Sequence, residues 1–149
     1  MRSIWNESDR HELTSRLARL GPNDIPAWGK MNAPQMLAHI TDWIRMAIGD
    51  MKVESKNTPF RFSPLKEILI YGIPIPRNLP TAPELIKNQP GVWTEEMHHV
   101  KDLLNKAAAM HSKPNTRWPE HPAFGRISGH AWGVLGYRHT DHHLRQFRV

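Results

Sequence analysis

Two histidines near the end of the chain, His139 and His143, lie four residues apart. On an α-helix this spacing places both imidazoles on one face, one turn from each other, where they can bind the same metal ion. A chain with ten histidines also contains such pairs by chance. The spacing alone therefore does not separate a metal ligand from an ordinary histidine.

The helical face that carries the pair is more informative than the spacing. Ala131 and Leu135 precede the two histidines on this face, and Gln146 follows them. A stripe that begins with apolar residues faces the core of the protein, and a polar ring in a core needs a partner there. We therefore expect both imidazoles to point inward.

A third histidine, His39, is flanked by apolar residues and shares a helical face with Met36, Trp43 and Ala47. Inward histidines from two helices can meet in a helical core, and three imidazoles suit Zn, Ni, Fe or Mn with positions left open for water. Because imidazoles are neutral, the ion keeps its full charge and can lower the pKa of a bound water to about 7, or polarise a substrate oxygen or sulfur. The hypothesis is one divalent metal ion with three protein ligands: His39, His139 and His143.

A simpler interpretation needs no metal. His39 would donate a hydrogen bond to a backbone carbonyl, and the other two histidines would lie at a hydrated end of the helices. His142 points about a quarter turn away from His143, so we assign it a supporting or structural role. The remaining histidines show no spacing that converges with these: His11, His98, His99, His111, His121 and His130.

Four polar residues lie close enough in sequence to orient the ligand rings. Gln35 and Asp42 are about one turn either side of His39, and Asp141 and Gln146 flank the later pair. Each can accept the free N–H of a ligating imidazole, although each is also ordinary as a solvated polar residue. Asp42 is the only candidate for a catalytic residue, as a general base.

Segments of helical periodicity would position these residues. The first covers residues 8–20, with Asn6 or Ser8 as its N-cap. The second begins at Asn32, which caps it, and ends at Gly49 in the usual C′ role.

Two further helices follow later in the chain. One opens at Thr94, whose hydroxyl can cap it, with Glu95 and Glu96 at the positive end of the helix dipole, and it continues to about Met110. The last begins near Ser128 and runs almost to the end of the chain.

The connection between the second and third helices is about 40 residues long and too rich in proline for a regular element throughout. Residues 65–71 are expected to form a short extra helix, and the stretch should pack over the helices and line the opening of the site. The predicted fold is an all-α four-helix bundle with one long crossover, in a single domain over residues 1–149. The prolines of the connection are Pro59, Pro64, Pro74, Pro76, Pro80, Pro83 and Pro90.

The amino-acid composition limits which metal ligands, partners and cellular location we expect. The absence of cysteine excludes disulfides, iron–sulfur clusters, thiolate-bound zinc and a thiol nucleophile, so a metal must be held by His, Asp or Glu. The net charge of +6 is spread along the chain rather than gathered in a run, so we do not expect nucleic acid as a partner. With no apolar run of about 20 residues, no signal peptide and no lipidation motif, we expect a cytoplasmic protein without a membrane partner.

The histidines also lie within motifs that resemble a known family. Residues 28–39 (WGKMNAPQMLAH), 80–85 (PTAPEL), 121–125 (HPAFG) and 139–147 (HTDHHLRQF) are similar to the DinB-like superfamily, and more narrowly to a branch of it known only as a domain of unknown function. The similarity extends over nearly the whole chain. It implies an up-down-down-up four-helix bundle and a metal triad at three positions of this sequence: His39, His139 and His143.

The resemblance also implies classes of activity. Members of the superfamily include metal-dependent hydrolases and transferases or isomerases that use low-molecular-weight thiols. We therefore expect an enzyme whose metal centre activates water or a thiol cosubstrate. The reaction would be hydrolysis or S-transfer on a small substrate. The expected metal is Zn or Ni, with Fe or Mn as alternatives. The alternative is a metal-binding stress protein without turnover. A homodimer is a further implication of the family.

Overall fold

The structure is a computed structural model of the chain, and it describes residues 1–77, 85 and 90–149. Within these residues there are helices and no β-strand, and the only β-bridge is an isolated pair between His121 and Gly125. The all-α prediction is confirmed for this part of the chain. The helices are α1 Glu7–Leu17, α2 Ala33–Ala47, the 3₁₀-helix η1 Pro59–Arg61, α3 Leu65–Glu67, the π-helix η2 Ile68–Gly72, α4 Trp93–His111 and α5 Gly129–Gln146.

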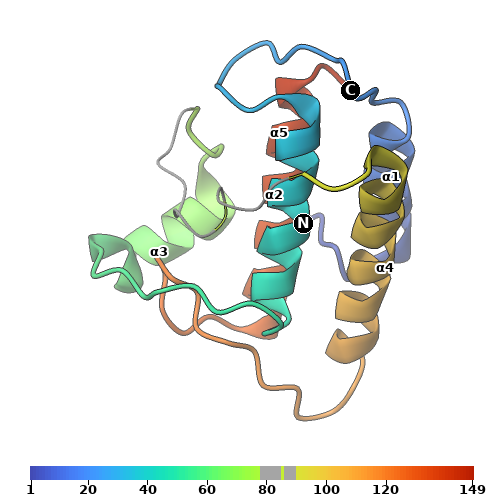
Figure 1. Cartoon of the computed structure of the whole chain (residues 1–149). Helices are drawn as coiled ribbons and strands as arrows, with labels where there is room; N and C mark the ends of the chain where they lie inside the picture. The colour runs from blue at the N-terminus through green and yellow to red at the C-terminus, as the bar shows by residue number, and fades with distance from the viewer. Residues whose placement is uncertain (78–84, 86–89) are drawn as a thin grey trace.

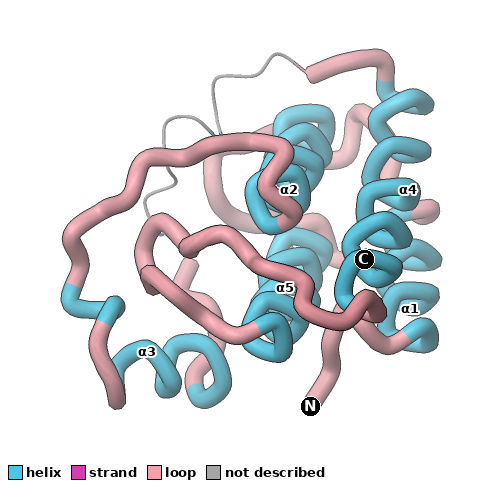
Figure 2. The backbone as a smooth tube through the Cα atoms, turned by 90° about the horizontal axis from the view of Figure 1, so that it is seen from below, coloured by secondary structure: helices cyan, strands magenta, loops and turns pink. Residues whose placement is uncertain are grey.

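The four long helices, α1, α2, α4 and α5, lie alongside one another, and α3 stands to one side of them in both views (Figures 1 and 2). Helix α2 packs against α4 and α5, and α1 packs against α5 and α4. The two helices that carry the predicted metal ligands, α2 and α5, are therefore neighbours.

Side-chain caps fix where three of the long helices begin. Asn6 caps α1 by accepting from the backbone N–H of Ser8. Asn32 and Gln35 form a reciprocal capping box at the start of α2, and Ser128 accepts from the third residue of α5. Asn6 and Asn32 were among the predicted N-caps, and α5 begins beside Ser128 as predicted, whereas the capping roles of Gln35 and Ser128 were not predicted. Gly49 follows α2 with a φ of +84°, as predicted for the C′ position.

The predicted boundaries of two helices were wrong. Helix α4 begins at Trp93 because the carbonyl of Val92 already accepts from the N–H of Glu96, so Thr94 lies inside the first turn and caps nothing. Helix α1 ends at Leu17 rather than at residue 20, since the chain there tightens into i to i+3 hydrogen bonds that include Leu20 to Leu17.

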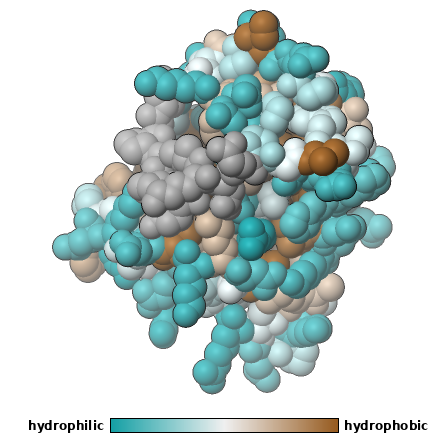
Figure 3. All heavy atoms as spheres, in the orientation of Figure 1, coloured by the Kyte–Doolittle hydropathy of each residue, from teal (hydrophilic) through white to brown (hydrophobic). Residues whose placement is uncertain are grey.

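Apolar side chains of the four long helices fill the core. Fully buried members from different helices include Leu13, Ile40, Leu104 and Trp132. Hydrophilic residues cover most of the described surface on the face shown in Figure 3. None of the described helices is long and apolar enough to cross a membrane.

The stretch after α2 contains the expected extra helix. Residues 65–67 form α3, and the π-helix η2 continues it to Gly72, close to the predicted range. Arg138 of α5 donates to the carbonyls of Leu69, Ile70 and Ile73, which ties this helical stretch to the helix that carries two of the histidines. Residues 78–84 and 86–89, which include most of the PTAPEL motif, lie outside the described residues.

A glycine of α5 makes room for the N-terminal segment. The carbonyl of Gly133 accepts from Ile4, and a Cβ at this position would lie 2.1 Å from Nε1 of Trp5 and 2.4 Å from Oγ of Ser3. Alanine favours helices over glycine by up to about 1 kcal/mol, but overpacking a core costs about 1–3 kcal/mol.

Gly133→Ala should therefore lower the free energy of unfolding, by up to about 2 kcal/mol once a helix gain of about 1 kcal/mol is subtracted from the overpacking cost. Denaturant unfolding followed by circular dichroism measures this change. Ser15→Ala, at an exposed position of α1, is the control and should leave stability unchanged or slightly higher. A more stable Gly133→Ala protein would contradict the close packing of residues 3–5 on α5.

Candidate metal centre

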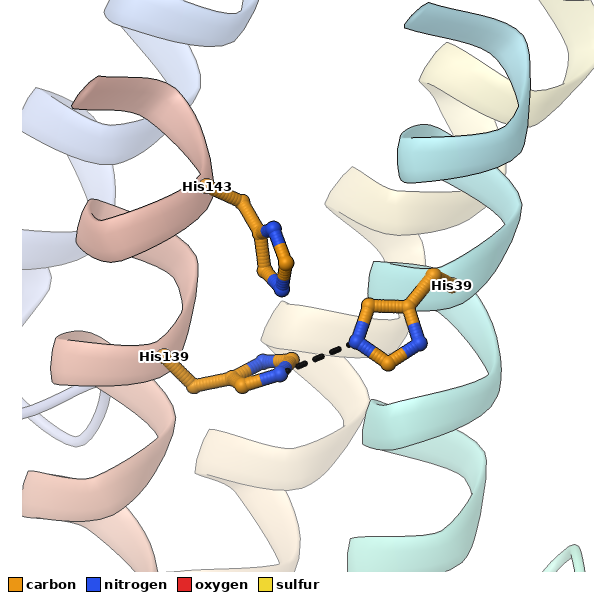
Figure 4. A group of neighbouring side chains, drawn as sticks. All are labelled: His39, His139 and His143. Atoms are coloured by element: carbon orange, nitrogen blue, oxygen red, sulfur yellow. Dashed lines mark hydrogen bonds between the residues drawn. The ribbon is translucent and has the colours of Figure 1, made fainter. Parts of the chain in front are cut away.

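His39 of α2 and His139 and His143 of α5 meet between their helices (Figure 4). One nitrogen from each ring lies within 4.8 Å of the others, and among the described residues this is the only group of three or more metal-ligating side chains. Nε2 of His39 is 3.1 Å from Nε2 of His139. Figure 4 shows a nitrogen of His143 pointing toward the same space.

In two of these three rings, the nitrogen that faces away from the cluster is hydrogen-bonded to an oxygen. Nδ1 of His39 lies 3.2 Å from the carbonyl of Leu85, and Nδ1 of His143 lies 3.0 Å from Oε1 of Gln146. Because these oxygens only accept, both Nδ1 atoms carry the proton and both Nε2 atoms present a lone pair. This is the tautomer that a metal ligand requires.

The third ring, His139, differs from the other two. Facing a lone pair on His39, its Nε2 carries the proton in the metal-free protein and donates across the 3.1 Å contact. Its Nδ1 is then a buried acceptor, and no described residue donates to it. The ring is fixed instead by stacking on Trp43, with 4.9 Å between ring centroids and 21° between planes.

The distance between one pair of nitrogens, those of His39 and His139, fits a tetrahedral ion. Zinc–imidazole distances of about 2.0–2.1 Å place two ligand nitrogens about 3.3 Å apart, close to the 3.1 Å between His39 and His139. The proton on Nε2 of His139 would have to move to Nδ1, a change of tautomer within the neutral ring, before this nitrogen could bind a metal. The donor type of all three rings and the tautomers of His39 and His143 therefore suit one divalent ion.

Burial keeps the rings neutral. It lowers the pKa of His143 to about 3, with the nearby His39 adding to the effect, and it lowers the pKa of His139 well below its usual value. Burial also lowers the pKa of His39, against the opposing effects of its hydrogen bond to Leu85 and of the Asp42 carboxylate. Neutral imidazoles are the form that binds a metal, so burial prepares the site at neutral pH.

The simpler interpretation is thus half right. His39 does donate to a backbone carbonyl, but its other nitrogen faces His139 rather than water. His143 is buried, with 7% of its surface exposed, and does not lie at a hydrated end of the helix. A carbonyl bond on Nδ1 is also the usual support of a ligating histidine, so it agrees with the metal hypothesis.

Gln146 is held in place by the segment that precedes α2. The side-chain Nε2 of Gln146 donates to the backbone carbonyl of Trp28 at 2.6 Å, and the backbone carbonyl of Gln146 accepts from the N–H of Ala27 at 2.7 Å. Gly29 has a φ of +84°, and a Cβ there would lie 2.3 Å from Nε2 of Gln146. This close approach fixes the amide so that Oε1 faces His143.

Gln146→Ala should weaken zinc binding by about 10–100-fold, the usual cost of losing the hydrogen bond that orients a ligating histidine. Competition with a chromogenic chelator measures the affinity. Gln35→Ala is the matched control because this glutamine closes the capping box of α2 instead, so its loss should lower stability and leave zinc affinity unchanged. Equal effects of both variants on zinc affinity would contradict the role of Gln146.

The other residues expected to orient a ligand have different partners. Gln35 is part of the capping box. Asp141 pairs with Arg16 of α1 at 2.7 Å and with Arg145 at 3.0 Å, so it ties α5 to α1. Asp42 is buried and pairs with Arg45 at 3.1 Å. Its role as a general base stays a prediction.

His142 lies beside the centre without joining it. Its ring meets that of His143 edge-on at 5.3 Å and that of Trp28 at 6.0 Å. Burial lowers its pKa, and the guanidinium of Arg77 acts in the same direction. The sequence prediction of a supporting role is consistent with this position.

Sequence reasoning missed three groups near the centre. The carbonyls of Leu85 and Trp28 are backbone atoms, which no residue type reveals. His121 accepts the backbone N–H groups of Ala123 and Phe124 at Nδ1, and burial lowers its pKa to about 3. Its position in the HPAFG motif was the only hint.

An aromatic contact path joins His121 to the centre. Its ring lies 5.2 Å from that of Trp132, which meets Trp43 at 5.7 Å, and Trp43 stacks on His139. Trp43 and Trp132 thus form an apolar wall behind one ligand.

Comparisons of the chain with protein families, with curated proteins and with solved structures each found no match.

Proposed function

We propose that this protein is a metal-dependent enzyme in which His39, His139 and His143 hold one divalent ion. The observation that carries the proposal is the convergence of three imidazole nitrogens within 4.8 Å of one another. Two of these rings present an Nε2 lone pair because Leu85 and Gln146 accept from their Nδ1 atoms. A site of three neutral ligands has the form of a catalytic centre, since a structural zinc site is normally closed by four ligands.

The donor set favours Zn or Ni, with Fe and Mn as alternatives, because three imidazoles without thiolates suit all four metals. When bound, the ion supplies Lewis-acid chemistry to water or to a low-molecular-weight thiol. The chain itself keeps the three rings neutral through burial and shields one of them with the Trp43 indole. We assign Asp42 as the candidate for moving a proton.

The reaction classes that we propose are hydrolysis and S-transfer on a small substrate. They follow from the resemblance to the DinB-like superfamily, which we propose as the family of this chain. The four long helices would then form its up-down-down-up bundle in a single domain. The cytoplasmic location and the homodimer rest on the same resemblance and on the sequence.

Metal analysis followed by activity assays tests the proposal. Purified, untagged protein should contain about one equivalent of divalent metal, and His39→Ala should contain none. The metal-loaded protein should then hydrolyse small ester or amide substrates with metal alone, or transfer a low-molecular-weight thiol to an electrophile when that thiol is added. Bound metal without turnover in either assay would favour the metal-binding stress protein, and no metal even after reconstitution would end the proposal.

A further inference from the structure

A row of aromatic and cationic side chains extends from the metal centre on the His143 side. His142 lies against His143, and Trp28 lies against His142, with ring centroids 5.3 and 6.0 Å apart. The guanidinium of Arg77 lies over the Trp28 ring, 4.1 Å from its centroid. Stacking on an indole holds a guanidinium flat and leaves its N–H edge available for hydrogen bonds.

The positive charge at the end of this row is not neutralised within the described residues. Arg77 is exposed, and none of the ion pairs in this part of the chain includes it. Asp141, the carboxylate that acts on His142, is occupied by Arg16 and Arg145. A guanidinium that is held in place but unpaired is a ready binding group for a carboxylate.

Trp28 adds a second unfilled donor. Its Nε1 is buried, and no described residue accepts from it. A buried donor without an acceptor costs about 1–3 kcal/mol, so an oxygen that reached it would gain a favourable bond. Both unfilled groups are donors, which suits an acceptor with negative charge.

Consecutive contacts link Arg77 to the centre: its guanidinium lies over the Trp28 ring, the Trp28 ring meets that of His142, and His142 meets His143. A molecule that followed this row would have one end at the guanidinium and the other at the metal centre.

We propose that Arg77, supported by Trp28, binds a carboxylate group of the small molecule whose other end is at the three-histidine centre. A carboxylate fits better than a phosphate dianion because one unpaired guanidinium matches one negative charge. The part of this inference that concerns the metal rests on the proposed function. The substrate or cosubstrate would then be an organic acid rather than a neutral compound.

Calorimetric titration of the zinc-loaded full chain tests this assignment with two pairs of probes, each pair differing only in charge. The probes are 3-mercaptopropionate and 6-mercaptohexanoate, each compared with its amide. At least one acid should bind about tenfold more tightly than its amide, the size expected for one charge-assisted hydrogen bond. Arg77→Gln should remove this preference, and the control Arg126→Gln, at another exposed arginine, should keep it.

Two results would overturn the inference: no preference for either acid in the unaltered chain, or the same preference in Arg77→Gln. The proposed function is judged separately, by zinc content and by binding of the amides, which depend on the metal alone. If the protein bound no zinc, the proposed function would fail, and glutarate titrated into the metal-free chain would still measure anion binding. Equal glutarate affinity of the unaltered chain and Arg77→Gln would then overturn the role of Arg77, and weaker binding by the variant would support it.

Discussion

Replacing His39 by Ala should weaken zinc binding by about 1,000-fold or more, because a first ligand is lost rather than a group that merely orients one. His39 is the sole ligand from α2, so its loss leaves the two α5 rings to hold the ion alone. Competition with a chromogenic chelator gives the dissociation constants of both proteins.

Two further variants make this result specific. His39→Phe keeps a ring in the buried position but offers no nitrogen, so it should lose zinc binding to the same extent as His39→Ala. His99→Ala, at an exposed position of α4, should bind zinc as the unaltered chain does. Unchanged affinity in His39→Ala, with the helical circular dichroism spectrum retained, would contradict the three-histidine centre.

The metal-free protein should lose stability steeply in mild acid. In the unfolded chain histidines take up protons below about pH 6.5, whereas burial lowers the pKa of His121 and of His143 to about 3 in the folded chain. The pKa values of His39 and His139 are lowered as well. The stability that these neutral rings allow is therefore fully present above pH 6.5 and is lost as the pH falls toward 3.

Each such histidine should reduce the free energy of unfolding by up to about 1.4 kcal/mol per pH unit in this window. Urea unfolding of the metal-free chain between pH 7 and pH 4 measures the total slope. His143→Gln should reduce this slope by the equivalent of about one bound proton, which is about 1.4 kcal/mol per pH unit. His98→Gln, at an exposed position of α4, should leave the slope unchanged. A stability that does not depend on pH over this range would contradict neutral burial of these rings.

That His39, His139 and His143 lie close together could be predicted from the sequence because helical periodicity indicates which way a side chain points. His139 and His143 continue the apolar stripe of α5, and His39 lies among buried residues of α2. The cap Asn32 was predictable for a similar reason, since a short polar side chain before an apolar periodic segment is a usual N-cap. Helical periodicity and N-capping depend only on residues that are close together in the sequence, so a single sequence is enough to predict them.

The supporting contacts could not be predicted because they depend on where loops lie. The carbonyls of Leu85 and Trp28 reach the centre from two separate connections, and any residue type can supply a carbonyl. Gln146 was one of four residues that could orient a ligand, and only the position of residues 27–29 distinguishes it from Asp141. The error at Thr94 arose because a valine can begin a helix when its carbonyl is available.

The most direct test of the three-histidine centre is an anomalous difference map from crystals of the zinc-loaded protein, recorded at the zinc absorption edge. We expect one strong peak between α2 and α5, about 2.0–2.1 Å from Nε2 of His39, His139 and His143, with the Nδ1 atoms of His39 and His143 still bonded to Leu85 and Gln146. Zinc found only on exposed histidines, or no peak between these helices, would contradict it.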